Sequence, residues 1–139
     1  MNKHTESCFC HDLQQLLEEQ EKLSLKGFRF VCESIGYDTI PFIISNQECR
    51  FEAFGRSVTG NCFITPVFRL EKLDINHCCA VLSLLEPVDI DGCPMEFCDE
   101  VYSLIKTQEC IIVDLSCFCA LEPLSPKLVD RPLPIIEPK

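Results

Sequence analysis

The sequence predicts a mainly β fold, an antiparallel β sandwich or barrel, from three observations. Short runs rich in Val, Ile, Phe and Thr recur about every ten residues over the range 28–121. Turn residues separate these runs at distances that suit hairpin loops rather than the long crossovers of parallel sheets. The length of 139 residues and the hydrophobic content of 47% suit a single domain with one core.

Residues 1–26 form a polar arm that we expect to contain a short amphipathic helix. Asp12 followed by Gln15 is typical of a capping-box start, and Gly27 is typical of a helix end. Because so short a helix is rarely stable alone, it needs a partner surface, either on its own domain or on a neighbouring copy. One helical stripe carries its apolar side chains, which are Leu13, Leu16, Leu17 and Leu23.

Residues 27–121 form the predicted β domain, with one short helix inserted before its last strand. That helix is expected to start near Pro94, a residue suited to a first helical turn, and its apolar face comprises Phe97, Val101, Leu104 and Ile105. The predicted strands are Phe28–Cys32, Thr39–Ser45, Arg50–Phe54, Asn61–Thr65, Val67–Leu73, Cys78–Leu85 and Cys110–Ala120.

The last segment, 122–139, is rich in proline. Five of the nine prolines of the chain lie between Pro123 and Lys139. Because proline cannot donate a hydrogen bond within a sheet, we expect an extended C-terminal tail here.

Charge and hydropathy exclude two classes of partner. The formal net charge is −10, and so acidic a protein repels phosphate backbones, which predicts no binding to nucleic acid. No apolar run approaches the length of about 18 residues that a membrane span needs, so we expect no membrane partner. Met1–Lys26 lacks the apolar core of a signal peptide, so we expect synthesis in a reducing cytoplasm.

The unusual feature is the cysteine content, 12 residues in 139. In a reducing compartment cysteines are usually metal ligands or catalytic groups, but a protein can also be made reduced and oxidised later. A catalytic cysteine needs a histidine base, and only His4, His11 and His77 are present. His77 and Cys78, as neighbours on a strand, face opposite ways. The sequence also lacks a glycine-rich phosphate loop, so we expect neither an enzyme nor a bound cofactor.

A zinc site is the main competing interpretation. Structural zinc sites usually show two closely spaced Cys-x2–4-Cys pairs. Here no Cys-x2-Cys is present, and the weak alternative ligand set is Cys8, Cys10 and His11. The alternative function is then a soluble zinc-binding or adaptor module.

The positions of the cysteines separate two groups. Cys117 and Cys119 share an apolar face of the last predicted strand, so we expect both inside the domain. Cys78 and Cys79 are adjacent, so one of them faces outward, and the remaining candidates lie on the arm or beside the inserted helix. The candidates for intermolecular disulfides are Cys8, Cys10, Cys78, Cys79, Cys93 and Cys98.

Several of these strands resemble those of one protein family. The motif Val113-Asp-Leu-Ser-Cys-Phe-Cys-Ala120 carries most of the likeness. Supporting it are Asp38-Thr-Ile-Pro-Phe42, Phe51-Glu-Ala-Phe-Gly55, Pro66-Val-Phe-Arg-Leu70 and Cys79-Ala-Val-Leu82. Over this range the chain is similar to the spore-surface family of Bacillus-type bacteria that comprises spore coat proteins Y and Z and exosporium protein Y, with the crust-type members the nearest.

The resemblance implies a structural protein that assembles into an ordered two-dimensional layer of the outer coat crust or exosporium, reinforced by disulfides. Its partners are then copies of itself, arranged as hexameric rings in a sheet, and other spore coat or exosporium proteins. The resemblance also implies synthesis in the mother-cell cytoplasm without a signal peptide and a final location at the spore surface.

Overall fold

The computed structural model describes residues 8–26, 37–57, 59–98 and 100–134, without the side chains of residues 8, 25 and 26. The chain begins with the helix α1 (Cys8–Lys26). The strands follow as β1 (Phe42–Ser45), β2 (Ala53–Arg56), β3 (Cys62–Thr65), β4 (Phe68–Asp74), β5 (Cys79–Val88), β6 (Ser103–Asp114) and β7 (Ala120–Pro123). Two 3₁₀ helices flank β7, namely η1 (Leu115–Cys117) and η2 (Pro126–Leu128).

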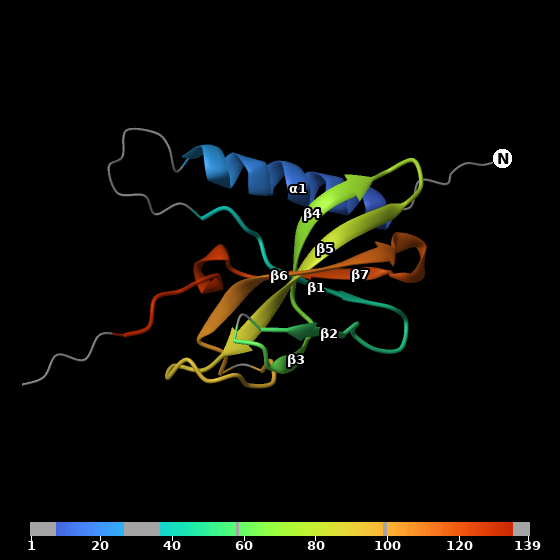
Figure 1. Ribbon diagram of the computed structural model, residues 1–139. Helices are drawn as coiled ribbons and strands as arrows, with labels where there is room; N and C mark the ends of the chain where they lie inside the picture. The colour runs from blue at the N-terminus through green and yellow to red at the C-terminus, as the bar shows by residue number, and fades with distance from the viewer. Residues whose placement is uncertain (1–7, 27–36, 58, 99, 135–139) are drawn as a thin grey trace, which may run out of the picture.

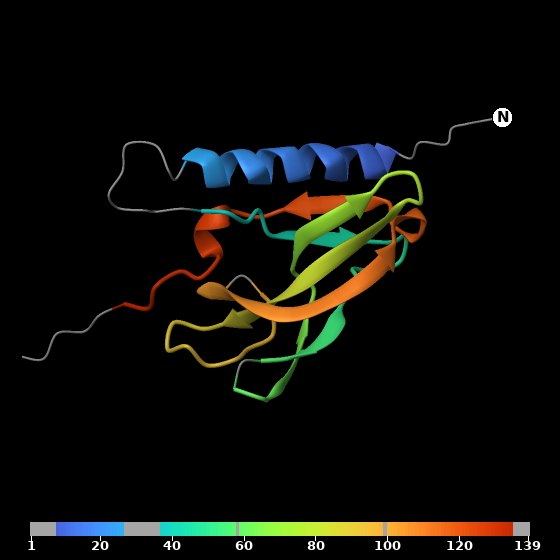
Figure 2. The same cartoon turned by 45° about the horizontal axis from the view of Figure 1, so that its top comes forward.

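The prediction of a mainly β, antiparallel fold is confirmed (Figure 1). Five strands form one sheet in the order β6-β5-β4-β1-β7, and β2 and β3 form a separate hairpin. All of the pairings between these described strands are antiparallel. The described strands do not close into a barrel, so a sandwich fits better of the two predicted forms (Figure 2). The predicted strand Phe28–Cys32 lies outside the described residues.

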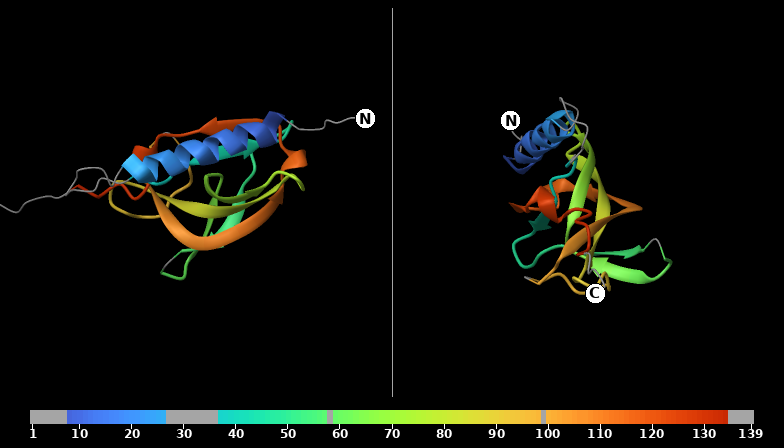
Figure 3. Two further views of the ribbon diagram at one scale, coloured as in Figure 1. Left: turned by 90° about the horizontal axis from the view of Figure 1, so that it is seen from above. Right: turned by 90° about the vertical axis from the view of Figure 1, so that its left-hand side faces the viewer.

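The main core extends from α1, through the five-stranded sheet, to the β2–β3 hairpin, which lies on the other side of the molecule (Figure 3). The helix contributes Phe9, Cys10, Leu13 and Leu16, all of them buried. They join Phe42, Ile44, Ala53, Phe63, Phe68, Leu70, Ala80, Leu82, Leu84, Val113 and Leu115. The helix therefore packs on its own domain, the first of the two partner surfaces that its sequence allows.

Polar contacts also hold α1 to the sheet. Gln20 is only 3% exposed. Its Nε2 atom donates to the Leu70 carbonyl at 3.0 Å, and its Oε1 atom accepts from the Ile40 N–H at 3.0 Å. Both amide ends of Gln20 are thus used to satisfy buried backbone groups.

The helix starts earlier than the sequence predicts, at Cys8 rather than near Asp12. Phe9 and Leu13 are spaced four residues apart and both are buried, so the apolar stripe extends one turn further than the leucines alone indicate. Asp12 is an exposed residue within the helix. None of the helices in the described part of the chain is long and apolar enough to cross a membrane.

The predicted helix starting at Pro94 does not form among the described residues, because the backbone there bonds to β5 instead. The Met95 N–H donates to the Pro87 carbonyl at 3.1 Å, and the Tyr102 N–H donates to the Val88 carbonyl at 2.9 Å. Three of the four apolar residues predicted for the helix are nevertheless packed inward. Phe97, Val101 and Leu104 belong to a second, smaller core with Ile43, Val67, Leu85, Leu124, Leu128 and Val129.

The first part of the proline-rich segment is built into the fold. β7 pairs with β1 at the edge of the sheet, where Pro123 ends the strand without interrupting the ladder. After η2, the Asp130 N–H donates to the Leu104 carbonyl of β6 at 2.8 Å. Residues 135–139 lie outside the described residues.

Candidate cross-linking cysteines

Seven of the cysteines whose side chains the structure describes are exposed, and they are the candidate functional groups of the chain. Cys78 and Cys79 are half-buried, and Cys10 is buried. Exposed thiols react with oxidants and with other chains more readily than buried ones. The exposed residues are Cys49, Cys62, Cys93, Cys98, Cys110, Cys117 and Cys119.

One group of cysteines lies at the end of the five-stranded sheet where β5 starts and β6 stops. Cys79 opens β5 opposite the last residue of β6. The Leu115 N–H donates to the Cys78 carbonyl at 2.9 Å, and the Cys119 N–H donates to the Ser45 carbonyl at 2.9 Å. These bonds bring η1 and β7 beside the start of β5 and the end of β1. We call this group the end cluster, consisting of Cys49, Cys78, Cys79, Cys117 and Cys119.

The prediction that Cys117 and Cys119 lie in the core is wrong for a local reason. Asp114 Oδ1 accepts hydrogen bonds from the Ser116 hydroxyl at 2.7 Å and from the Ser116 N–H at 3.0 Å, which starts the turn η1. These hydrogen bonds also lower the pKa of the Asp114 carboxyl. Strand alternation therefore ends at Asp114. Phe118, rather than either cysteine, packs against the core, and its ring centroid lies 5.3 Å from that of Phe51.

Cys93 and Cys98, two of the predicted candidates, are exposed in the loop between β5 and β6. Asp89 Oδ1 accepts from the Cys93 N–H at 2.9 Å, and the Asp89 N–H donates to the Cys93 carbonyl at 2.9 Å. Residues 94–97 of the same loop line a cleft of about 470 Å³ together with Cys62 of β3. We call Cys62, Cys93 and Cys98 the loop cluster.

The end cluster and the loop cluster are far apart on the molecule. They lie at opposite ends of β5 (Figures 1 and 2). A strand of ten residues spans roughly 30 Å, at about 3.3 Å per residue. Cys110 lies between them, exposed on β6 and opposite Ser83. One copy can therefore offer thiols to neighbours on more than one side.

Cys10 differs from the other predicted intermolecular candidates. It lies inside α1 and is only 5% exposed, whereas the prediction of an intermolecular disulfide requires an accessible thiol on the arm. Its Sγ atom lies 2.6 Å from the Sγ atom of Cys78 in the same copy. Cys8 is the first residue of α1, and its side chain lies outside the described part of the structure.

The described residues offer little for metal binding. Among them, no group of three or more His, Cys, Asp and Glu side chains could hold a metal ion. His11, from the alternative ligand set, is exposed on α1. His77 Nδ1 lies 2.8 Å from Asp74 Oδ2, and the hydrogen bond from His77 lowers the pKa of that carboxyl.

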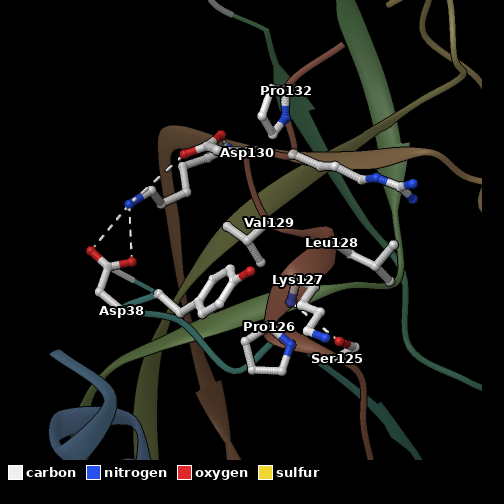
Figure 4. Close-up of a pocket in the computed structure, with 11 residues that line it drawn as sticks. Asp38, Ser125, Pro126, Lys127, Leu128, Val129, Asp130 and Pro132 are labelled. Atoms are coloured by element: carbon white, nitrogen blue, oxygen red, sulfur yellow. Dashed lines mark hydrogen bonds and ion pairs between the residues drawn. The ribbon is translucent and has the colours of Figure 1, made fainter. Parts of the chain in front are cut away.

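A cleft of about 860 Å³ lies beside the segment 125–132 (Figure 4). The Lys106 side chain lines this cleft. Its Nζ atom lies 3.1 Å from Asp38 Oδ1 and 3.9 Å from Asp130 Oδ2. Burial raises the pKa of the Asp38 carboxyl, but hydrogen bonds from Thr39 and Lys106 outweigh this effect and lower it. None of the described residues that line this cleft is a cysteine or a histidine, so the exposed thiols remain the candidate site.

Sequence reasoning missed Cys49, Cys62 and Cys110, although the pattern around each one could have found it. Cys62 precedes Phe63 in a predicted strand, and Phe63 is buried while Cys62 faces outward. Cys110 shares a face of the last predicted strand with the polar residues Asp114 and Ser116. Cys49 lies in a turn, where Asn46 Oδ1 accepts from its N–H at 2.9 Å.

Comparison with known proteins confirms the resemblance seen in the strand motifs. The sequence family described as "Spore coat protein Z" matches residues 1–126. The chain is 37% identical over 147 residues to "Spore coat protein Z" of Bacillus subtilis (strain 168), which covers 94% of this chain and 97% of that protein. No solved structure matches the chain.

Proposed function

The chain belongs to the spore coat protein Z family, and we propose that it assembles with copies of itself into an ordered two-dimensional layer reinforced by intermolecular disulfides. Family membership gives the chain a structural role in the outer layers of the spore. Within those layers, the proposed position is the coat crust or the exosporium. The proposal also includes synthesis in the mother-cell cytoplasm and contacts with other coat proteins.

The observation that supports the proposal most strongly is the distribution of exposed thiols. A layer of identical subunits needs at least two distinct contacts, for example a heterologous patch that closes a ring and a two-fold patch that joins rings. The end cluster and the loop cluster lie at opposite ends of β5. Each can therefore serve a different contact, and hexameric rings joined into a sheet are one arrangement that uses both.

The timing of oxidation gives the cysteines a role in assembly. In a reducing cytoplasm the thiols stay reduced, so that subunits can dock and separate until they are correctly placed. After the mother cell lyses, the exterior is oxidising, and exposed thiols of neighbouring copies can form disulfides by exchange. A single intrachain disulfide typically stabilises a fold by about 2–4 kcal/mol through lost freedom of the unfolded chain. Repeated links between copies would make a layer resistant to heat.

Electron microscopy of the purified full-length chain, with and without reductant, tests this proposal. We expect ordered layers or rings in both samples, and we expect only the air-oxidised sample to survive heating. The proposal is contradicted if the protein stays dispersed as single copies under air, at high concentration, with its exposed thiols still titratable.

A variant without the thiols of the loop cluster separates the effect of disulfides on heat resistance from the effect of non-covalent contacts. Replacing Cys62, Cys93 and Cys98 together by Ser should leave docking intact but lower the temperature at which oxidised assemblies dissociate. Gln108→Ser, an exposed change on β6 that removes no thiol, is the matched control and should leave that temperature unchanged. Equal heat resistance of the triple variant and the control would argue against the loop cluster as a cross-linking site.

A further inference from the structure

We propose that Cys10 and Cys78 form a disulfide within one chain, and that this bond fastens α1 to the turn between β4 and β5. Their Sγ atoms lie 2.6 Å apart, although the residues are 68 positions apart in the sequence. Only a small further approach reaches the disulfide bond length of about 2.05 Å. The inference does not depend on assembly into a layer, since it concerns a single copy.

The fold holds both sulfurs at this position. On the helix side, Cys10 lies between Phe9 and Leu13, which are 7% and 0% exposed. The Phe9 ring packs on Phe118, with ring centroids 6.3 Å apart. The helix therefore cannot turn Cys10 away from the sheet without exposing apolar side chains.

On the sheet side, the backbone of Cys78 is fixed from both directions. Its N–H donates to the Ile75 carbonyl at 3.3 Å, and its carbonyl accepts from the Leu115 N–H at 2.9 Å. Cys78 has a φ of 53°, a left-handed conformation that favours glycine and is uncommon for other residues. Glycine would adopt this turn without steric cost, but it would supply no sulfur opposite Cys10. The cysteine at this position is explained if its sulfur is used.

The oxidation balances with a small disulfide, such as glutathione disulfide, as the electron acceptor. The Cys78 sulfur is the more accessible of the two, so its thiolate attacks the small disulfide and one small thiol leaves. The Cys10 thiolate then attacks the Cys78 sulfur of this mixed disulfide, and the second small thiol leaves. Each cysteine loses one proton, and the small disulfide gains two electrons.

The bond divides the end cluster into an internal link and a set of thiols that remain for neighbouring copies. These remaining thiols are Cys49, Cys79, Cys117 and Cys119.

Peptide mapping by mass spectrometry without reductant tests the inference on the full-length chain. Protein treated with glutathione disulfide is quenched in acid, alkylated and digested, and the peptides are searched for the link. The adjacent cysteines supply matched controls. We expect the linked peptide in the wild type, in Cys8→Ser and in Cys79→Ser, and its loss in Cys10→Ser and Cys78→Ser. Reductant should lower the melting temperature of the first three proteins by more than that of the last two, which keep only the other disulfides.

If a variant fails to fold, fragment ions of the linked wild-type peptide that separate Cys8 from Cys10 and Cys78 from Cys79 decide the matter. Alkylation of both Cys10 and Cys78 after unfolding in the absence of reductant would overturn the inference. So would a link that survives Cys10→Ser or disappears in Cys8→Ser, since either result assigns the Cys78 sulfur to another partner. Layer formation by the same sample is scored separately, so failure of this bond and failure of the proposed function are distinguishable.

Discussion

The substitution Leu13→Ala tests whether α1 is part of the domain that carries the cysteines. Leu13 is fully buried in the main core, between α1 and the sheet. Truncating a buried leucine removes its transfer free energy and leaves a cavity, which together cost about 2–5 kcal/mol. Because the side chain is fully buried, we expect a loss of about 3 kcal/mol in the free energy of unfolding.

Urea unfolding followed by far-ultraviolet circular dichroism measures this loss. With a slope of about 2 kcal/mol per molar urea, a loss of about 3 kcal/mol lowers the midpoint by about 1.5 M. Reductant is included so that packing is measured without disulfides. Gln15→Ala, an exposed change on the same helix, is the control and should change the stability by less than about 0.5 kcal/mol.

Two results would refute this reasoning. A Leu13→Ala midpoint equal to that of Gln15→Ala would mean that α1 is not packed as described. A loss in Leu13→Ala, relative to Gln15→Ala, that shrinks on tenfold dilution would mean that the helix packs on a neighbouring copy instead, the second surface that the sequence allows.

Two further predictions concern buried polar groups. Gln20→Ala leaves the Leu70 carbonyl and the Ile40 N–H without their partner, and should cost about 1–3 kcal/mol for each such group in the same urea assay; a loss below about 0.5 kcal/mol would argue against those contacts. Glu86 is 5% exposed, and burial raises the pKa of its carboxyl above the ordinary value of 4.5. Its ionised form therefore destabilises the fold at neutral pH. This loss of stability disappears once the pH falls below 4.5, where the carboxyl is protonated in both the folded and the unfolded chain. Glu86→Gln should therefore be more stable than the wild type at pH 7, with the difference shrinking towards pH 4, and a difference independent of pH would contradict this reasoning.

Strand positions were predictable where apolar and polar residues alternate. In β3, Phe63 and Thr65 are buried while Cys62 and Ile64 are exposed, as the period of two requires. This alternation is what predicts a strand over residues 61–65. The short turn before it predicts the hairpin of β2 and β3.

The errors arose where hydrogen bonds that these patterns do not reveal decided the structure, within a turn in one case and between separate segments in the other. The Asp114 side chain caps η1 and ends the alternation that placed Cys117 in the core. In the region after Pro94, the spacing of Phe97, Val101 and Leu104 fits a helical face as well as an apolar loop that leads into a strand. Pairing with β5 decides between these forms, and that pairing depends on distant residues.

The exposure of the candidate cysteines was predictable only in part by residue. Cysteine content and spacing predict thiols that cross-link copies, which stays a prediction, and Cys93 and Cys98 are exposed as that prediction requires. The proximity of Cys10 to Cys78 could not be predicted, since it depends on how α1 packs against a turn 68 residues later.

The most direct test of cross-linking between copies uses isotopes. Reduced protein of natural isotopic composition is mixed with an equal amount of ¹⁵N-labelled protein, allowed to assemble, oxidised, and mapped by mass spectrometry without reductant. We predict disulfide-linked peptide pairs that combine one light and one heavy peptide and contain exposed cysteines of the end or loop cluster. If every disulfide joins peptides of the same isotope, or if no disulfide forms, the exposed cysteines do not link neighbouring copies.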